Sequence, residues 1–353
     1  MTEQQGQKSN LCYKGDIQPD SSNLDDLYPY IPGEDLKKAV NIAIALEKPL
    51  LIQGEPGCGK TLLASAIAYE FGQRYLNGTE WPFFAWAVTS RSRADEARYT
   101  FDALGRLRDT QFLATGKNEI DSEQEEKLRN RLNNPANYIQ WGPIGKAFNV
   151  WEIRPDLKEI DCNVNIRPIL LIDEIDKADI DLPNDLLRDL DQWYFEVKET
   201  QTEIPEKRYR KAHKPIVIIT SNQDRPLPEA FLRRCLFFYL KFPDKTNLRQ
   251  IVEERFKRQF GSKTPEDIIE AAIKKFREIR DTAYLQKPPT TSELIDWLSF
   301  LLTSEKLTSQ KTDRQIEELL EKELDDPTKI GILLKSQSDI ETLNRRRKDR
   351  RLE

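Results

Sequence analysis

Residues 50–64 read Leu50-Leu51-Ile52-Gln53-Gly54-Glu55-Pro56-Gly57-Cys58-Gly59-Lys60-Thr61-Leu62-Leu63-Ala64. The apolar run Leu50–Ile52 predicts a short buried strand, and the glycines after it predict a loop without side-chain bulk. Residues 62–71 then predict a helix. A strand, a glycine-rich loop and a helix in this order predict a site that binds phosphate groups through backbone N–H donors at a helix N-terminus.

The spacing of the glycines from Lys60 and Thr61 is that of a Walker A loop. In this pattern the loop N–H groups cradle phosphates, Lys60 neutralises the β and γ oxygens, and the Thr61 hydroxyl ligates Mg²⁺. We therefore expect ATP and Mg²⁺ as cofactors. The residues expected to bind nucleotide are Gly54, Glu55, Pro56, Gly57, Cys58, Gly59, Lys60, Thr61 and Leu62. The alternative is a glycine-rich turn without a ligand.

Two further strands end in polar residues of the types that nucleotide hydrolysis requires. The apolar run 168–172 leads into Asp173 and Glu174, and the run 215–220 leads to Asn222. Ligands bind at the carboxyl ends of parallel strands, so Asp173 is a candidate Mg²⁺ ligand together with Thr61. Glu174 is a candidate to polarise the attacking water, and Asn222 to orient it. For Asn222 an ordinary turn residue is the alternative.

Two arginines precede the last apolar strand, residues 236–240. Arg233 or Arg234 is placed to reach the γ-phosphate held by a neighbouring subunit, where a planar guanidinium stabilises developing charge. A surface salt bridge is the alternative reading of either arginine.

Composition limits the other classes of function. The chain has 353 residues, 33% of them charged, and a net charge of −5, which argues against a general nucleic-acid binder but leaves a local basic face possible. No apolar run reaches the length of a membrane span, and residues 1–20 lack a secretory hydrophobic region, so we expect a cytoplasmic protein without membrane association. Four cysteines without paired spacing fit a reducing compartment: Cys12, Cys58, Cys162 and Cys235.

Composition and periodicity divide the chain into four consecutive parts, the second of which contains an insertion. We expect a disordered leader at 1–28, an α/β nucleotide-binding domain at 29–243 with an insertion at about 91–148, a helical lid at 244–303, and a charged helical tail at 304–353. Thr290-Thr291-Ser292-Glu293 predicts a capping box that opens the last lid helix. The basic run 345–351 is interpreted as a solvated helix end rather than a nucleic-acid arm.

These motifs together resemble the AAA+ ATPases and, within them, the MoxR group, over roughly residues 29–303. The resemblance implies the P-loop NTPase fold, a five-stranded parallel sheet between helices followed by a small all-α lid. It also implies ring oligomers, commonly hexamers, with ATP at subunit interfaces. Asn222 falls on the sensor 1 position and Arg234, or else Arg233, on the arginine finger. The candidate catalytic residues are therefore Lys60, Glu174, Asn222 and Arg234.

One departure from the family concerns the lid. Many AAA+ lids carry an arginine near the start of the last lid helix, whereas residues 287–294 contain none, and Lys287 is the candidate replacement. Proteins similar to MoxR act as chaperone-like remodelers with partners that carry a von Willebrand factor A domain. The resemblance thus implies an ATPase that remodels or assembles a protein partner.

Two other functions remain open from the sequence. The first is a slow, nucleotide-gated scaffold that switches partners on ATP binding, for which the missing lid arginine argues and the presence of Glu174 argues against. The second is a nucleic-acid motor, which would rest on the run 345–351 and on Arg91, Arg93, Arg106 and Arg108.

Overall fold

The computed structural model describes residues 10–19, 29–115, 122–207, 214–260, 266–282, 285–303 and 313–352. The chain forms two compact units. Unit 1 contains residues 1–18, 32–53 and 60–239, and unit 2 contains residues 19–31, 54–59 and 240–353. Residues 54–59 thus belong to unit 2, together with residues 240–353. The domain boundaries expected from the sequence placed them instead within the α/β domain, 29–243.

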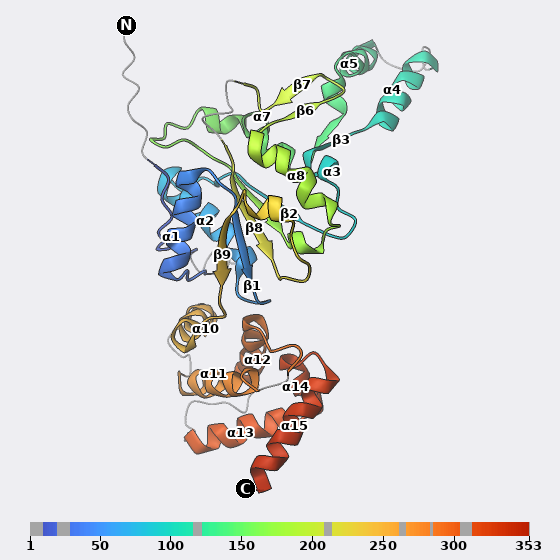
Figure 1. Ribbon diagram of the computed structural model, residues 1–353. Helices are drawn as coiled ribbons and strands as arrows, with labels where there is room; N and C mark the ends of the chain where they lie inside the picture. The colour runs from blue at the N-terminus through green and yellow to red at the C-terminus, as the bar shows by residue number, and fades with distance from the viewer. Residues whose placement is uncertain are drawn as a thin grey trace. The chain divides into compact units, whose positions relative to one another are not determined.

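A five-stranded sheet forms the centre of unit 1 (Figure 1). Its order is β2 (Phe83–Ala87), β5 (Ile169–Asp173), β8 (Ile216–Ser221), β1 (Leu50–Gly54) and β9 (Leu236–Leu240). The pairs β2 with β5, β5 with β8, and β8 with β1 are parallel. Because parallel strands end at one edge, this order brings the carboxyl ends of β5, β8 and β1 together. The expected P-loop NTPase sheet is confirmed.

Helices cover both faces of this sheet, which explains why its central strands are continuous apolar runs. Successive residues of β5 point to opposite faces. Leu170 and Ile172 join the core formed with α6 (Pro143–Phe148) and α8 (Asp181–Gln192). Helix α2 (Lys60–Tyr75) also packs on β5 and β8. Helix α1 (Glu34–Leu46) buries one apolar stripe, which includes Leu36, Val40 and Ile44.

The segment 10–18 is ordered and bonded to unit 1. Tyr13 is 2% exposed, and its backbone exchanges two hydrogen bonds of 2.8 Å with the Asn41 side chain of α1. The carboxylate of Glu70, in α2, accepts the backbone N–H groups of Lys14 and Gly15 at 2.7 and 2.6 Å. The expectation of a disordered leader was therefore wrong for residues 10–18, because the half-buried Asn41 side chain and the buried Glu70 carboxylate bond to this backbone. Residues 1–9 and 20–28 lie outside the described part.

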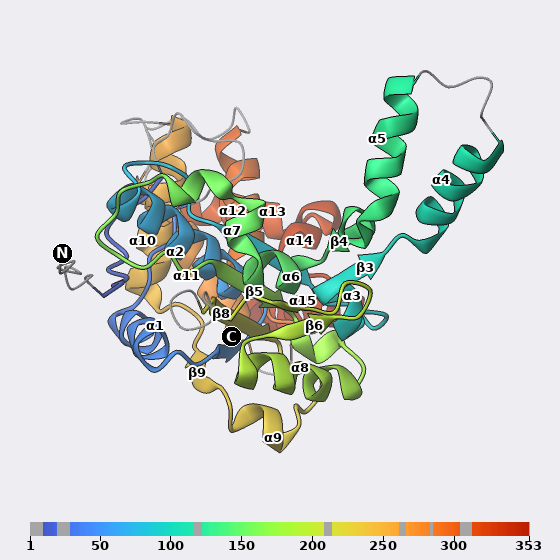
Figure 2. The same cartoon turned by 90° about the horizontal axis from the view of Figure 1, so that it is seen from above.

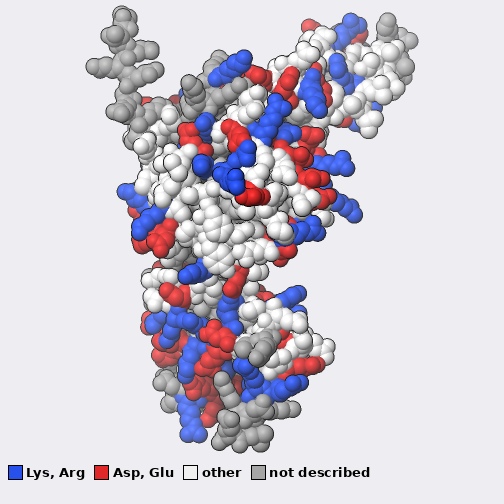
Figure 3. Space-filling model, in the orientation of Figure 1, with Lys and Arg blue, Asp and Glu red and all other residues white. Residues whose placement is uncertain are grey.

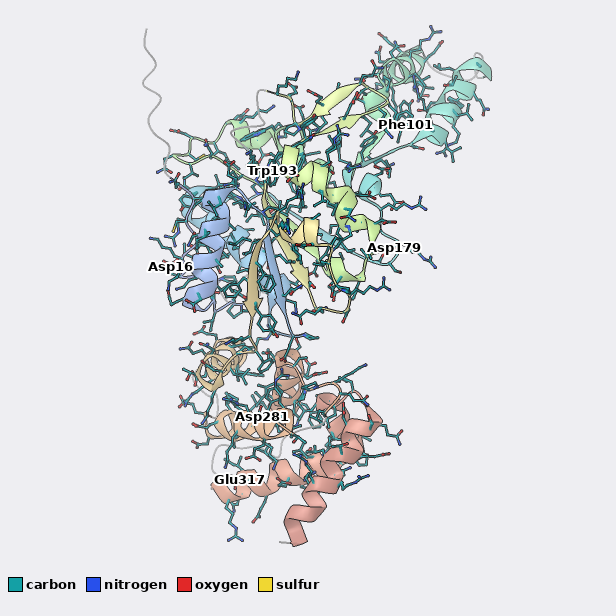
Figure 4. All side chains as sticks on the ribbon, in the orientation of Figure 1. Asp16, Phe101, Asp179, Trp193, Asp281 and Glu317 are labelled. Atoms are coloured by element: carbon teal, nitrogen blue, oxygen red, sulfur yellow. The ribbon has the colours of Figure 1, made fainter. Side chains whose placement is uncertain are left out.

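The insertion near 91–148 contains a two-helix arm, residues 102–138, carried by a short ladder. Strands β3 (Tyr99–Phe101) and β4 (Ile139–Trp141) pair antiparallel and hold helices α4 (Ala103–Thr115) and α5 (Ser122–Asn133) between them. Figure 2 shows both helices extending away from the sheet, and Figure 4 labels Phe101 at the root of the arm. On α4 three large apolar side chains are exposed: Leu104, Leu107 and Phe112.

Six helices of unit 2 share one apolar core: α10 (Lys245–Phe260), α11 (Glu266–Arg280), α12 (Thr291–Thr303), α13 (Asp313–Asp325), α14 (Pro327–Leu333) and α15 (Gln337–Leu352). The apolar stripe of α11 is buried in this core. The expected capping box is present in part, because Thr290 N donates to Glu293 Oε2 at 2.7 Å, one of its two bonds. The predicted boundary between a lid ending at 303 and a separate tail was wrong, because Leu320 and Leu333 are 1% exposed in the same core.

The remaining elements connect these parts. They are α3 (Ala94–Arg98), η1 (Pro135–Tyr138), α7 (Val150–Ile153), η2 (Pro155–Lys158), η3 (Ile175–Lys177), α9 (Glu229–Leu232), and the hairpin of β6 (Phe195–Val197) and β7 (Thr202–Ile204). The two strands of this hairpin pair antiparallel, and residues 208–213 beyond it are outside the described part. In the chain as described, every helix is either too short or too polar to cross a bilayer.

Candidate functional site

The hydroxyl of Thr61 and the carboxylate of Asp173 meet at the carboxyl end of β5. Thr61 is the second residue of α2, and its Oγ1 lies 2.9 Å from Asp173 Oδ1 and 3.2 Å from Oδ2. Lys60, the first residue of α2, is 6% exposed. The expected pairing of Thr61 with Asp173 therefore exists in the fold, and both groups offer the hard oxygen donors that Mg²⁺ prefers.

Thr220 connects the two acidic residues that end β5. This residue lies in β8 beside β5, is 1% exposed, and donates its hydroxyl to Asp173 Oδ1 at 2.6 Å. The hydroxyl oxygen of Thr220 in turn accepts the backbone N–H of Glu174 at 2.8 Å. A single hydroxyl thus fixes the direction of the Asp173 carboxylate and the peptide of the next residue.

The carboxylate of Glu174 is hydrogen bonded on both oxygens. Asn222 Nδ2 donates to Oε1 at 3.0 Å, and Lys177 Nζ forms an ion pair with Oε2. Glu174 itself has φ of 59°, in the left-handed region that few residues other than glycine adopt. The hydrogen bond to Glu174 raises the pKa of Lys177, which keeps the ammonium charged. Glu174 and Asn222, each of which follows an apolar strand, therefore lie in direct contact.

Asp176 fixes the turn that carries Asn222. It is 2% exposed, and its Oδ2 accepts the N–H groups of Asn222 and Asp224 at 2.9 and 2.8 Å. A buried carboxylate that accepts two backbone donors restrains the turn more firmly than a neutral acceptor would. The direction of the Asn222 amide therefore depends on Asp176.

The loop 54–59 has the backbone of a phosphate cradle. Gly57 and Gly59 have φ of 77° and 83°, and a Cβ on Gly57 would lie 2.3 Å from Thr290 Cβ. A Cβ on Gly54 would lie 2.3 Å from the carbonyl oxygen of Leu240. Side chains would therefore strain or displace the loop at all three glycines. Cys58 is buried, whereas Pro56 and Leu62 are exposed.

The lid residue that contacts this loop is Arg280 rather than the expected Lys287. Arg280 ends α11 and pairs with the carboxylate of Glu55. Lys287 is exposed, its backbone N–H donates to Asp339 at 3.1 Å, and it has no ion pair among the described residues. Arg280 lies at the end of the helix that precedes α12, outside residues 287–294, so the family pattern in the sequence does not point to it.

The two candidate finger arginines have different surroundings. The Nε of Arg234 donates to Asp191 in α8, and its Nη1 donates to the carbonyl of Ala230 at 2.8 Å. Arg233 pairs only with Glu229 in the described structure, and its side chain is 75% exposed. Arg234 is therefore the more firmly oriented of the two.

Comparison with known proteins adds a family. Domain III of the replication initiation protein DnaA from Thermotoga maritima, a crystal structure, is similar with a TM-score of 0.41 and 16% identity, covering 83% of this chain and 93% of that one. A likeness of this size carries no argument about function. No curated protein sequence matches. The family described as AAA domain (dynein-related subfamily) matches residues 49–235, more than half of the chain and all of the site residues above except Arg280 and Lys287. The chain therefore belongs to the AAA domain family, dynein-related subfamily.

Proposed function

We propose that this chain binds and hydrolyses ATP with Mg²⁺ and uses the reaction to remodel a protein partner. The observation that carries the proposal is the hydrogen-bonded group at the ends of β5 and β8, in which Thr61, Asp173, Glu174 and Asn222 converge. Its members have the chemical types that phosphoryl transfer to water requires. Membership of the AAA family supports a nucleotide-dependent activity.

The residues fit both cofactors. The glycines of the loop 54–59 keep side-chain bulk away from its backbone N–H donors, and Lys60 adds a positive charge at the start of α2. Thr61 and Asp173 would hold Mg²⁺. When bound, the metal ion offsets the negative charge of the phosphates.

Glu174 is the residue that would activate the attacking water. Its carboxylate polarises the water, and the amide of Asn222 fixes the direction of that carboxylate. Lys177 Nζ pairs with the second carboxylate oxygen, so the ammonium competes with water for that oxygen and makes the carboxylate a weaker base.

We further propose a ring oligomer, a hexamer by analogy with the MoxR group, in the cytoplasm. Proteins of the AAA+ class generally form rings, and Arg234 would supply its guanidinium to the site of a neighbouring subunit. The proposed partner is a protein, with a von Willebrand factor A domain as the first candidate. Its identity rests on the resemblance to the MoxR group alone.

The test is the steady-state ATPase rate of wild type and Glu174→Gln, measured beside the affinity for a fluorescent ATP analogue. We expect the variant to keep its affinity while kcat falls at least about 100-fold, the effect of losing a general base. Glu196→Gln, which changes an exposed glutamate of β6, is the matched control and should behave as wild type. Undiminished turnover by Glu174→Gln would refute the assignment, and failure of wild type to bind ATP would refute the function.

A slow nucleotide-gated switch is the second candidate, and the ion pair between Glu174 and Lys177 favours it. The same experiment separates the two, because a switch binds ATP tightly and wild type turns it over hardly faster than Glu174→Gln. A nucleic-acid motor has less support, since Arg347 of the basic run is paired with Glu321 and Asp325.

A further inference from the structure

Glu55 introduces a negative charge into a loop that, under the proposed function, binds phosphates. The residue follows Gly54 directly, and its side chain is 49% exposed. Two like charges a few ångströms apart repel each other in water, and they repel more strongly near a protein surface, where the effective dielectric constant is lower. An unpaired carboxylate at this position would therefore weaken the binding of any anion to the loop.

Arg280 pairs with this carboxylate from within the same unit. One terminal nitrogen of its guanidinium donates to Glu55, and the other donates to the carbonyl oxygen of Pro289. The side chain is only 10% exposed. Three segments of unit 2 therefore meet at one guanidinium: the phosphate loop, the end of α11, and the chain that enters α12.

Aromatic packing holds the guanidinium in place. Its central carbon lies 3.6 Å from the centroid of the Phe242 ring, and that ring stacks on Phe276 of α11 at 6.2 Å and 26°. A planar guanidinium can stack on a ring and donate along two edges at once, which an ammonium cannot do. Arg280 thus reaches Glu55 from a fixed position, while Glu55 is the more exposed partner.

We propose that Arg280 is a positioning residue that neutralises Glu55 and so lets the loop 54–59 accept a nucleotide. The inference rests on the proposed function, because it concerns the affinity of that loop for ATP. In this arrangement Arg280 acts through Glu55 and not by direct contact with the phosphates. The charge at position 55 therefore decides how much the loss of Arg280 costs.

A double-mutant cycle tests this dependence. The affinity for a fluorescent ATP analogue is measured by titration for wild type, Glu55→Gln, Arg280→Gln and the double variant. Arg280→Gln should bind about 10-fold more weakly, and Glu55→Gln about 3-fold more tightly because one repulsive charge is gone. The double variant should bind within about 2-fold of Glu55→Gln, because without the Glu55 charge the loss of Arg280 costs little. If Arg280→Gln weakens binding about 10-fold in the Glu55→Gln background as well, the two changes are additive, Arg280 does not act through Glu55, and the inference is overturned.

Two controls separate charge from folding. Arg249→Gln removes an arginine of unit 2 that pairs with Glu253 and Glu270 and not with the loop, so its affinity should equal that of wild type. Arg280→Lys keeps the charge without the planar fork and should lie between wild type and Arg280→Gln. The loss in Arg280→Gln should also shrink at high salt, which screens the exposed Glu55 charge.

The outcomes also distinguish this inference from the proposed function. If wild type binds no ATP analogue, the proposed function fails and the inference fails with it. If wild type binds and Arg280→Gln binds equally well, only the inference fails. A fall in affinity of the Arg249→Gln control equal to that of Arg280→Gln would likewise overturn it, because the loss would then reflect the net charge of the unit.

Discussion

Glu174 combines three restraints on one side chain. Its backbone is left-handed, its N–H donates to Thr220, and its two carboxylate oxygens are bonded to Asn222 and Lys177. Left-handed backbone in a non-glycine residue costs about 1 kcal/mol or more and persists only where surrounding contacts hold it. These restraints fix the carboxylate before any substrate arrives, and Lys177 is the one among them that opposes its use as a base.

Replacing Lys177 should therefore raise basal turnover. We expect Lys177→Met to increase kcat about 3- to 5-fold, the size of effect that an exposed ion pair supports. The Lys177→Arg variant keeps the charge and should stay near wild type. Because Glu174 raises the pKa of Lys177, the ammonium stays charged until the pH rises through that raised value, and the difference should persist across neutral pH. A kcat–pH profile checks this, and a lower kcat in Lys177→Met would contradict it.

The main residues of the site could be predicted because strand ends carry strong signals. Each of Asp173, Glu174 and Asn222 follows an apolar run, and parallel strands end at one edge. The sequence does not reveal the roles of Thr220 and Asp176. A polar residue beside a motif has the same sequence signal whether its side chain bonds to a neighbouring strand or faces water. Their roles depend on β5 and β8 being adjacent, a fact of the sheet order.

Among the elements, the N-terminal segment 10–18 is held mainly by one buried carboxylate. The Glu70 side chain is fully buried, and it bonds Arg74 Nη2 at 3.2 Å besides the two backbone N–H groups. Arg74 also pairs with Asp16, labelled in Figure 4, so it adds a second attachment. Removal of the carboxylate leaves two partly buried N–H donors without this acceptor, and an unsatisfied donor costs more than the net gain of a typical hydrogen bond.

Glu70→Ala should release this segment. We expect the free energy of unfolding to fall by about 3 kcal/mol, the sum of two charge-assisted hydrogen bonds. Trypsin should then cut after Lys14 much faster than in wild type, because an ordered backbone resists proteolysis. Glu96→Ala, which changes an exposed glutamate of unit 1, is the control. Equal rates of cleavage after Lys14 in all three proteins would show that Glu70 does not hold the segment.

Helices and strands could be predicted where the local apolar periodicity is strong. They could not be predicted where tertiary contacts determine the structure. The helix predicted at residues 62–71 exists, although α2 begins at Lys60 and extends to Tyr75. The order of the strands cannot be read from local pattern, because β8 lies between β5 and β1 although it follows both in sequence. The polar segment 10–18 has no periodic pattern that would predict its order, because side chains distant in the sequence, Asn41 and Glu70, order it.

At the scale of the whole molecule, the proposed ring predicts that activity depends on protein concentration. The ATPase rate per subunit should rise with concentration and reach a plateau. Arg234→Ala should lower that plateau by about 10³-fold, the low end of the effect of a guanidinium supplied by a neighbour. Sizing in parallel shows whether the rise coincides with assembly.

Arg233→Ala is the matched control, because Arg233 is adjacent in sequence and its ion pair with Glu229 is exposed. Its plateau should stay within about 3-fold of wild type, since an exposed pair contributes little. If Arg233→Ala loses activity and Arg234→Ala keeps it, the finger is Arg233. A rate per subunit that stays constant on dilution would refute the contribution from a neighbour.

Charge over the surface agrees with a protein partner. On the face shown in Figure 3, acidic and basic side chains are interspersed over both units. A continuous basic surface, which phosphate backbones require, does not form on the described part of that face. This distribution accords with the net charge of −5.

Because β3 and β4 pair with each other, the arm 102–138 is an insertion that can change without changing the rest of unit 1. Phe101 and Ile139 are paired residues, and Asp102 N donates to Tyr138 O at 2.9 Å, so the chain leaves and re-enters unit 1 at neighbouring points. A two-residue turn could join Phe101 to Ile139 as an ordinary hairpin. Related chains can therefore gain, lose or exchange arms here while the five-stranded sheet stays the same.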